Sequence, residues 1–124
     1  MFLNGWQAAY RSALQVLTRD QLPQYWSSVQ TNLGNALVDL AGNSEGAQAA
    51  TYLERAVAAY RGSLQVRTEA NFPAQWLFTM HNLALTYERK GDWSNARLGY
   101  EQLLRHEPGN AALQAKIREL ADRH

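Results

Sequence analysis

The chain has 124 residues, a formal net charge of +1 and no cysteine. Its acidic and basic residues are interspersed, which argues against a nucleic-acid or membrane-surface footprint, and the lack of cysteine excludes disulfide bonds and thiolate metal sites. No apolar run approaches the length of a membrane span and no secretory signal is apparent, so we expect a single cytoplasmic domain.

Helix-type periodicity dominates the chain from its beginning. The first helix is expected from about Asn4 to Leu17, and the second from Pro23 to about Gly42, because proline is favoured at the first helical position. The third helix has two candidate starts, at Ala47 and at the capping-box pattern Thr51-x-x-Glu54, of which the second is the clearer signal.

The second half of the chain predicts three further helices, which makes about six in all. Pro73 opens the fourth helix, which ends at Gly91-Asp92. Gly91 can adopt a positive φ at a helix end and Asp92 can cap the next helix, so the chain reverses in very few residues. Asn110 is expected to cap a last helix over 110–122, with a polar outer side.

Seven residues of the central stretch fall on the spacing of a known repeat: Met80, Leu83, Ala84, Tyr87, Ala96, Tyr100 and Pro108. The pattern W-x2-L-G-x2-Y…A-x3-F…P is that of the tetratricopeptide (TPR) family, which this stretch resembles, with Met in place of Trp, Ala in place of Gly and Tyr in place of Phe. Ala84 and Ala96 are expected to be small because the two helices approach closely there.

The chain also matches itself when shifted by fifty positions without a gap. Residues 8–33 and 58–83 share the unit AYRxxLQVxTxxxxPxxWxxxxxNL, which resembles the long TPR variant of large bacterial multidomain proteins. The resemblance implies an all-α, right-handed superhelical stack of antiparallel helix pairs. It divides the chain into an incomplete repeat (1–22), two full repeats (23–72 and 73–109) and a C-terminal cap (110–124).

The polar residues do not predict an enzyme. The three histidines, His81, His106 and His124, have no spacing suited to a metal, and no nucleophile motif or phosphate-cradling glycine loop is present. We therefore expect no catalytic site and no cofactor.

The TPR resemblance implies a concave groove that binds a peptide or helix of a partner protein. The residues expected on it lie off the packing stripes of the second and fourth helices: Ser28, Thr31, Asn32, Asn35, Asp39, Phe78, His81, Asn82, Leu85 and Arg89. Asn32 and Asn82 recur in register, and a side-chain amide can pair with both polar groups of an extended backbone. The alternative is that each amide hydrogen-bonds a neighbouring helix. No lysine is present in either set, so a carboxylate clamp of the kind found in chaperone-binding TPR domains is not expected.

A second function is suggested by the first helix, which has no partner helix before it. Trp6 falls where the register places the small residue Ala56, and Phe2 and Leu3 extend the same apolar edge. Because repeat arrays need capped ends, this edge predicts self-association into a homodimer or a longer array. The simpler alternative is that Trp6 folds over the end and seals it.

Overall fold

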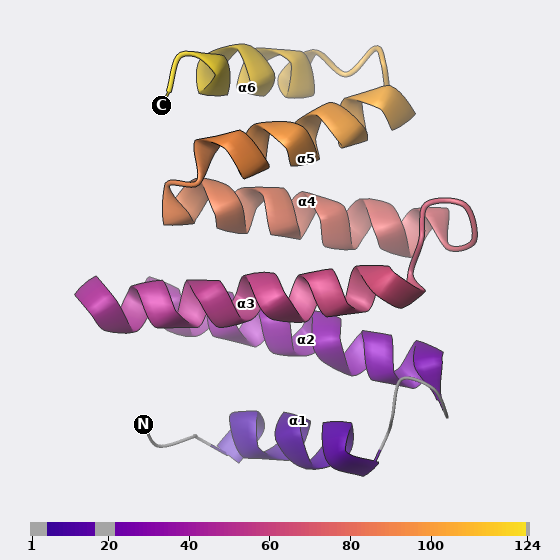
Figure 1. Cartoon of the computed structure of the whole chain (residues 1–124), viewed down its shortest axis with the longest axis vertical. Coiled ribbons are helices and arrows are strands. Elements are labelled where there is room, and N and C mark those ends of the chain that lie inside the picture. Colours follow the sequence, from indigo (N-terminus) through magenta and orange to yellow (C-terminus); the bar gives the residue numbers. More distant parts are fainter. Residues whose placement is uncertain (1–4, 17–21, 124) are drawn as a thin grey trace.

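The computed structural model describes residues 5–16 and 22–123, in which all regular structure is helical (Figure 1). These ranges contain the helices α1 (Gly5–Val16), α2 (Pro23–Gly42), α3 (Gly46–Val66), α4 (Pro73–Lys90), α5 (Trp93–His106) and α6 (Ala111–Ala121). The predictions of an all-α class and of about six helices are confirmed. No helix in the described ranges combines the length and apolarity needed to cross a bilayer.

The helices lie one above another in chain order, and the chain reverses direction at each connection (Figure 1). Each helix packs against the next one in the chain, and α2 also contacts α4. The contact between α2 and α4 brings together two faces that are separated in the sequence by the whole of α3.

Local signals explain most of the helix ends. Pro23 and Pro73 are the first residues of α2 and α4, where a missing N–H costs no hydrogen bond. Gly91 follows α4 with a φ of 80°, in the left-handed region that favours glycine. The carboxylate of Asp92 and the amide oxygen of Asn110 each accept a hydrogen bond from the backbone N–H three residues later. The predicted ends at these five residues are confirmed.

The preferred start of the third helix is wrong. The helix α3 begins at Gly46, close to the earlier candidate Ala47, so Thr51 and Glu54 are interior residues that cap nothing. The Thr51 hydroxyl instead donates to the carbonyl oxygen of Ala47, one turn back, at 2.9 Å. The alanine-rich sequence between Gly46 and Thr51 has a high helix propensity, which allows the helix to begin without a side-chain cap.

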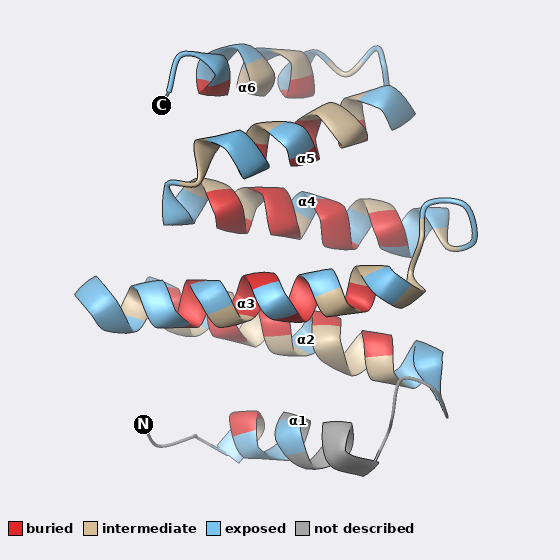
Figure 2. Ribbon diagram, viewed as in Figure 1, coloured by how far each residue is buried: buried red, intermediate tan, exposed pale blue. Residues whose placement is uncertain are grey.

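Buried residues face the neighbouring helices and are densest in α3 and α4 (Figure 2). Two crossings depend on small residues. A Cβ atom on Gly34 in α2 would lie 2.6 Å from the ring of Tyr60 in α3, and one on Gly99 in α5 would lie 3.0 Å from the Cβ of Ala84 in α4. Ala84 and Ala96 are both 0% exposed. The prediction that small residues permit a close approach here is confirmed.

A cluster of hydroxyl groups is buried where α2, α3 and α4 meet. The Thr31 hydroxyl lies 2.7 Å from that of Ser63 and 3.4 Å from that of Thr79, and Thr31 is only 3% exposed. The prediction that Thr31 lies off the packing stripe, on an open groove, is therefore wrong. A threonine can be buried at this position because its hydroxyl finds partners on two adjacent helices.

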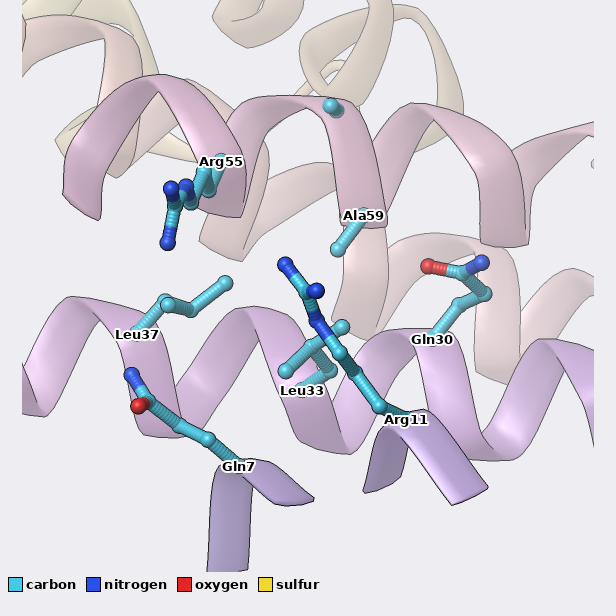
Figure 3. A pocket seen from close by; sticks show the side chains of 8 residues that line it. Gln7, Arg11, Gln30, Leu33, Leu37, Arg55 and Ala59 are labelled. Atoms are coloured by element: carbon cyan, nitrogen blue, oxygen red, sulfur yellow. The ribbon is translucent and has the colours of Figure 1, made fainter. Parts of the chain in front are cut away.

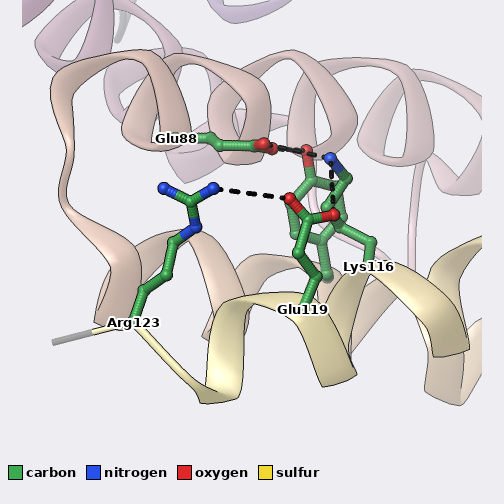
Figure 4. Close-up of polar contacts among 5 residues, drawn as sticks. Glu88, Lys116, Glu119 and Arg123 are labelled. Carbon is green, nitrogen blue, oxygen red and sulfur yellow. Dashed lines mark hydrogen bonds and ion pairs between the residues drawn. The ribbon is translucent and has the colours of Figure 1, made fainter.

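Polar side chains link α4 both to α5 and to α6 (Figure 4). Glu88 of α4 accepts a hydrogen bond from the Tyr100 hydroxyl at 2.9 Å and forms a 3.0 Å ion pair with Lys116 of α6. Glu119 lies 3.7 Å from Lys116 and 3.8 Å from Arg123. Because Glu88 and Lys116 are both half-buried, their ion pair is screened somewhat less by solvent than a fully exposed one.

Candidate functional site

The contact between α2 and α4 leaves a hollow of about 250 Å³ on one side of the molecule. Residues one helical turn apart on each helix share this face, because side chains at i and i+4 lie one above the other. The hollow brings together predicted groove residues from both helices, namely Asn35, Asp39, Phe78, Asn82, Leu85 and Arg89, and adds Val38, Tyr60 and Thr86.

A second hollow, of about 400 Å³, lies between α4 and α6. It is lined by Leu77, Phe78, His81, Asn82, Leu103, Glu107, Asn110, Ala112 and Leu113. Phe78 and Asn82 line both hollows, so the two adjoin along α4. We call the two hollows together the interhelix groove.

A pair of side-chain amides lies at the centre of the first hollow. The amide nitrogen of Asn82 donates to the amide oxygen of Asn35 at 3.2 Å, and the same oxygen accepts a hydrogen bond from the Tyr60 hydroxyl. Asn82 thus bonds a neighbouring helix, as one of the two sequence-based alternatives expected. Within residues 22–123, the side-chain amide nitrogen of Asn35 and the side-chain amide oxygen of Asn82 have no hydrogen-bond partner. The pair therefore presents one donor and one acceptor to a ligand.

Tyr60 holds this amide pair in place. Its side chain is 1% exposed, and burial, together with the negative charge of Asp39, raises the pKa of Tyr60 above its ordinary value, while Arg89 acts in the opposite direction. The hydroxyl is therefore protonated at neutral pH and can donate to Asn35. Asp39 and Arg89 are themselves exposed and opposite in charge, so they leave the first hollow close to neutral.

The apolar part of the groove is concentrated at Phe78. This residue is 56% exposed, as expected for a position off the packing stripe. Leu85 differs from that expectation in part, because it is half-buried and packs against the core. His81 is exposed, and its ring lies 6.4 Å from that of Tyr100, edge to face. An exposed phenyl ring shared by two hollows is a suitable anchor for an apolar side chain of a partner.

The N-terminal half of α2 does not contribute to the groove. Asn32 is exposed but lines neither hollow, and Thr31 is buried. Ser28 is half-buried, accepts a hydrogen bond from the Arg67 guanidinium and lines a different hollow beside Pro23. Of the residues predicted to self-associate, Phe2 and Leu3 lie outside the described ranges and Trp6 is half-buried.

The sequence analysis missed the contribution of α6. It assigned 110–122 only to a cap, whereas Asn110 and Leu113 form a wall of the second hollow. A signal was available, because in a repeat of helix pairs the segment after α5 takes the place of the first helix of a third pair, beside α4. Tyr60 was assigned to the core from the apolar stripe of its helix. That stripe indicates that the ring is buried but does not indicate that the hydroxyl reaches the edge of the hollow.

Comparison of the chain with protein-family models, with curated proteins and with solved structures gives no match. The likeness to TPR repeats therefore depends on the spacing of the chain's own residues.

Proposed function

We propose that the chain is a protein-interaction domain of the TPR type, which binds a peptide or helix of a partner protein in the interhelix groove. In this proposal the helices form a right-handed superhelical stack, and α2, α4 and α6 are the first helices of successive pairs. The two small-residue crossings support it, because Gly34 packs on Tyr60 in one pair as Ala84 packs on Gly99 in the next. The fifty-residue self-match relates Gly34 to Ala84.

The amide pair of Asn35 and Asn82 is the observation that carries the binding proposal. Its donor and acceptor match the C=O and N–H of a peptide group, and this match favours an extended segment, whose backbone groups are not already paired within a helix. Phe78 lies beside the pair and supplies apolar contact for a side chain of the same segment. The first hollow carries one acid and one base, so we expect a peptide of low net charge.

The test begins with selection of binding peptides from a displayed random library, followed by affinity measurement with the Phe78→Ala/Asn82→Ala double variant. We expect binding to weaken by about 30-fold or more, since an interface anchor contributes about 2 kcal/mol or more. Circular dichroism should show an unchanged helix content, because Phe78 is exposed and Asn82 is only half-buried.

The chain offers a matched control for each substitution. Asn32 is the register mate of Asn82 but lines neither hollow, and Leu98 is another exposed apolar residue, 51% exposed, that lies outside the groove. The Asn32→Ala/Leu98→Ala variant should bind the selected peptides as the parent does. Equal losses in the two double variants, or unfolding of the Phe78→Ala/Asn82→Ala variant, would show that the groove is not the binding site.

A further inference from the structure

The second hollow of the interhelix groove combines apolar walls with a carboxylate. Leu77, Leu103 and Leu113 line it from α4, α5 and α6. Glu107, the residue that follows α5, is the acidic residue of this lining, and its Oε2 accepts a hydrogen bond from the Asn110 side chain at 3.1 Å. Glu107 is exposed and forms no ion pair with any residue in 22–123. The hollow therefore carries a negative charge that a ligand can reach.

Two arginines near the other end of the stack lie too far away to neutralise this charge. Arg11 and Arg55 line a furrow of about 300 Å³ between α1, α2 and α3, above Leu33 and Leu37 (Figure 3). The furrow shares no lining residue with either hollow of the interhelix groove. A counterion for Glu107 therefore has to come from a ligand or from solvent.

Glu107 has an equivalent in the first pair of helices. Arg67 follows α3 as Glu107 follows α5, and the backbone N–H of each donates to the carbonyl oxygen four residues earlier in the chain. The same offset along the chain relates Tyr60 to Tyr100, which are both buried. Arg67 and Glu107 therefore occupy matching positions at the ends of successive second helices.

In the first pair, the chain itself places a guanidinium at this position. The Arg67 guanidinium donates to the hydroxyl of Ser28 on α2, and both residues are half-buried. Burial lowers the pKa of Arg67 below its ordinary value, as expected for a cation partly withdrawn from water. The fifty-residue match relates Ser28 to Phe78, which lines the second hollow with Glu107. The second pair thus has a carboxylate and a phenyl ring where the first has a guanidinium and a hydroxyl.

An arginine side chain from outside fits this arrangement. Its guanidinium can pair with a carboxylate through two parallel hydrogen bonds and can stack on an aromatic ring, and its methylene stem can lie along apolar surface. An ammonium group is more strongly hydrated and lacks the planar fork, so lysine fits less well. The volume of the hollow, about 400 Å³, lies within the range of small-molecule sites.

We propose that the second hollow is a specificity pocket for an arginine side chain of the bound peptide. Glu107 pairs with the guanidinium, Phe78 stacks on it, and Leu113 contacts the methylene stem. Because Asn82 lines both hollows, this arginine lies close in sequence to the peptide group that bonds the amide pair. The inference rests on the proposed peptide-binding function and names a side chain that the groove selects.

A small probe tests the pocket without a whole peptide. Nα-acetyl-arginine amide is titrated into the isotope-labelled full chain and followed by NMR at about pH 8, at which histidine side chains are ordinarily neutral. We expect saturable shifts of the backbone amides of Glu107 and Leu113, with a dissociation constant in the millimolar range. Nα-acetyl-citrulline amide has a similar shape without the charge and should bind about tenfold more weakly or worse.

Substitutions of Glu107 test its role directly. Glu107→Gln should weaken binding of the arginine probe by about tenfold. Glu107→Arg copies Arg67 and should abolish probe binding with unchanged helix content, because arginine already occupies the matching position after α3. Glu54→Gln is the matched control, since it removes the same charge from an exposed residue that lines neither hollow, and it should leave probe binding unchanged.

The displayed peptide library separates failure of this inference from failure of the proposed function. Peptides selected on the parent chain should be enriched in arginine, and those selected on Glu107→Gln should not be. Selected peptides that depend on Phe78 and Asn82 but show no arginine enrichment would overturn the inference and leave the proposed function standing. A library that yields no binding peptide would count against the proposed function itself. Equal binding of the arginine and citrulline probes, a lack of saturation, or equal losses in Glu107→Gln and Glu54→Gln would also overturn the inference.

Discussion

Replacement of Gly34 by alanine tests the close approach of α2 to Tyr60 of α3. The added Cβ would lie 2.6, 2.8 and 2.9 Å from three ring atoms of Tyr60. These distances are shorter than a real carbon–carbon contact, so one of the two helices or the ring must shift. The ring has little freedom to do so, because Tyr60 is buried and its hydroxyl is bonded to Asn35.

Two opposing effects determine the size of the change. Alanine in place of glycine inside a helix stabilises by about 1 kcal/mol, whereas overpacking a core costs about 1–3 kcal/mol. We therefore expect Gly34→Ala to lower the free energy of unfolding by up to about 2 kcal/mol. Gly42 is the matched control, since it ends the same helix and a Cβ there meets nothing within 4 Å. Gly42→Ala should be neutral or slightly stabilising.

Urea unfolding followed by circular dichroism measures both variants. With a slope of about 1–3 kcal/mol per molar urea, a difference of about 2 kcal/mol separates their midpoints by roughly 1 M. The slopes themselves should agree, because neither substitution changes the surface exposed on unfolding. If Gly34→Ala were as stable as Gly42→Ala, the crossing of α2 and α3 would be wider than the structure shows.

Three further outcomes are expected. The melting temperature should fall as the pH rises above about 10. Burial raises the pKa of Tyr100, and a hydrogen bond to Glu88 raises the pKa of Lys116. A group whose pKa is raised by folding stabilises the fold below its ordinary pKa, and this stabilisation is lost as the pH rises above that value. Tyr100→Phe should make this fall shallower. Thr31→Val should cost about 1–3 kcal/mol in urea unfolding by depriving the Ser63 hydroxyl of its partner, and much of this should be recovered by adding Ser63→Ala; a purely additive double variant would argue against the pairing. Trp6→Ser should shift any homodimer towards monomer in light scattering with its helicity intact, and an unchanged mass would count against the self-association alternative.

The helix ends that sequence reasoning placed correctly are those with a strong local signal. Pro23, Pro73 and Gly91 act within one turn of the backbone, so no knowledge of the tertiary structure is needed to interpret them. A local signal can also mislead, as at the start of α3. Thr51 and Glu54 have the residue types of a capping box, but they lie inside a helix that begins five residues before Thr51, at Gly46.

Sequence reasoning predicted the groove residues best where they lie on one regular helix. On α4, Phe78, Asn82, Leu85 and Arg89 follow one stripe of an uninterrupted helix, and the structure places all four at the first hollow. The prediction that Thr31 lies on the groove was wrong because a polar residue was assumed to be exposed, whereas the Thr31 hydroxyl is hydrogen-bonded inside the core. The position of α6 beside the second hollow depends on how separate helices stack. The residue pattern of a single helix contains no information about that stacking.

Each helix packs mainly against its neighbours in the chain, so a helix at one end of the stack can unfold locally while the others stay folded. The helix α6 buries only Leu113 and Leu120, whereas α3 and α4 bury many more side chains. Amide hydrogen exchange should therefore be faster in α6 than in α3 and α4. Because Leu113 lines the second hollow, each opening of α6 removes one wall of it. A peptide held there should slow exchange throughout α6, whereas one confined to the first hollow should leave that exchange rate unchanged.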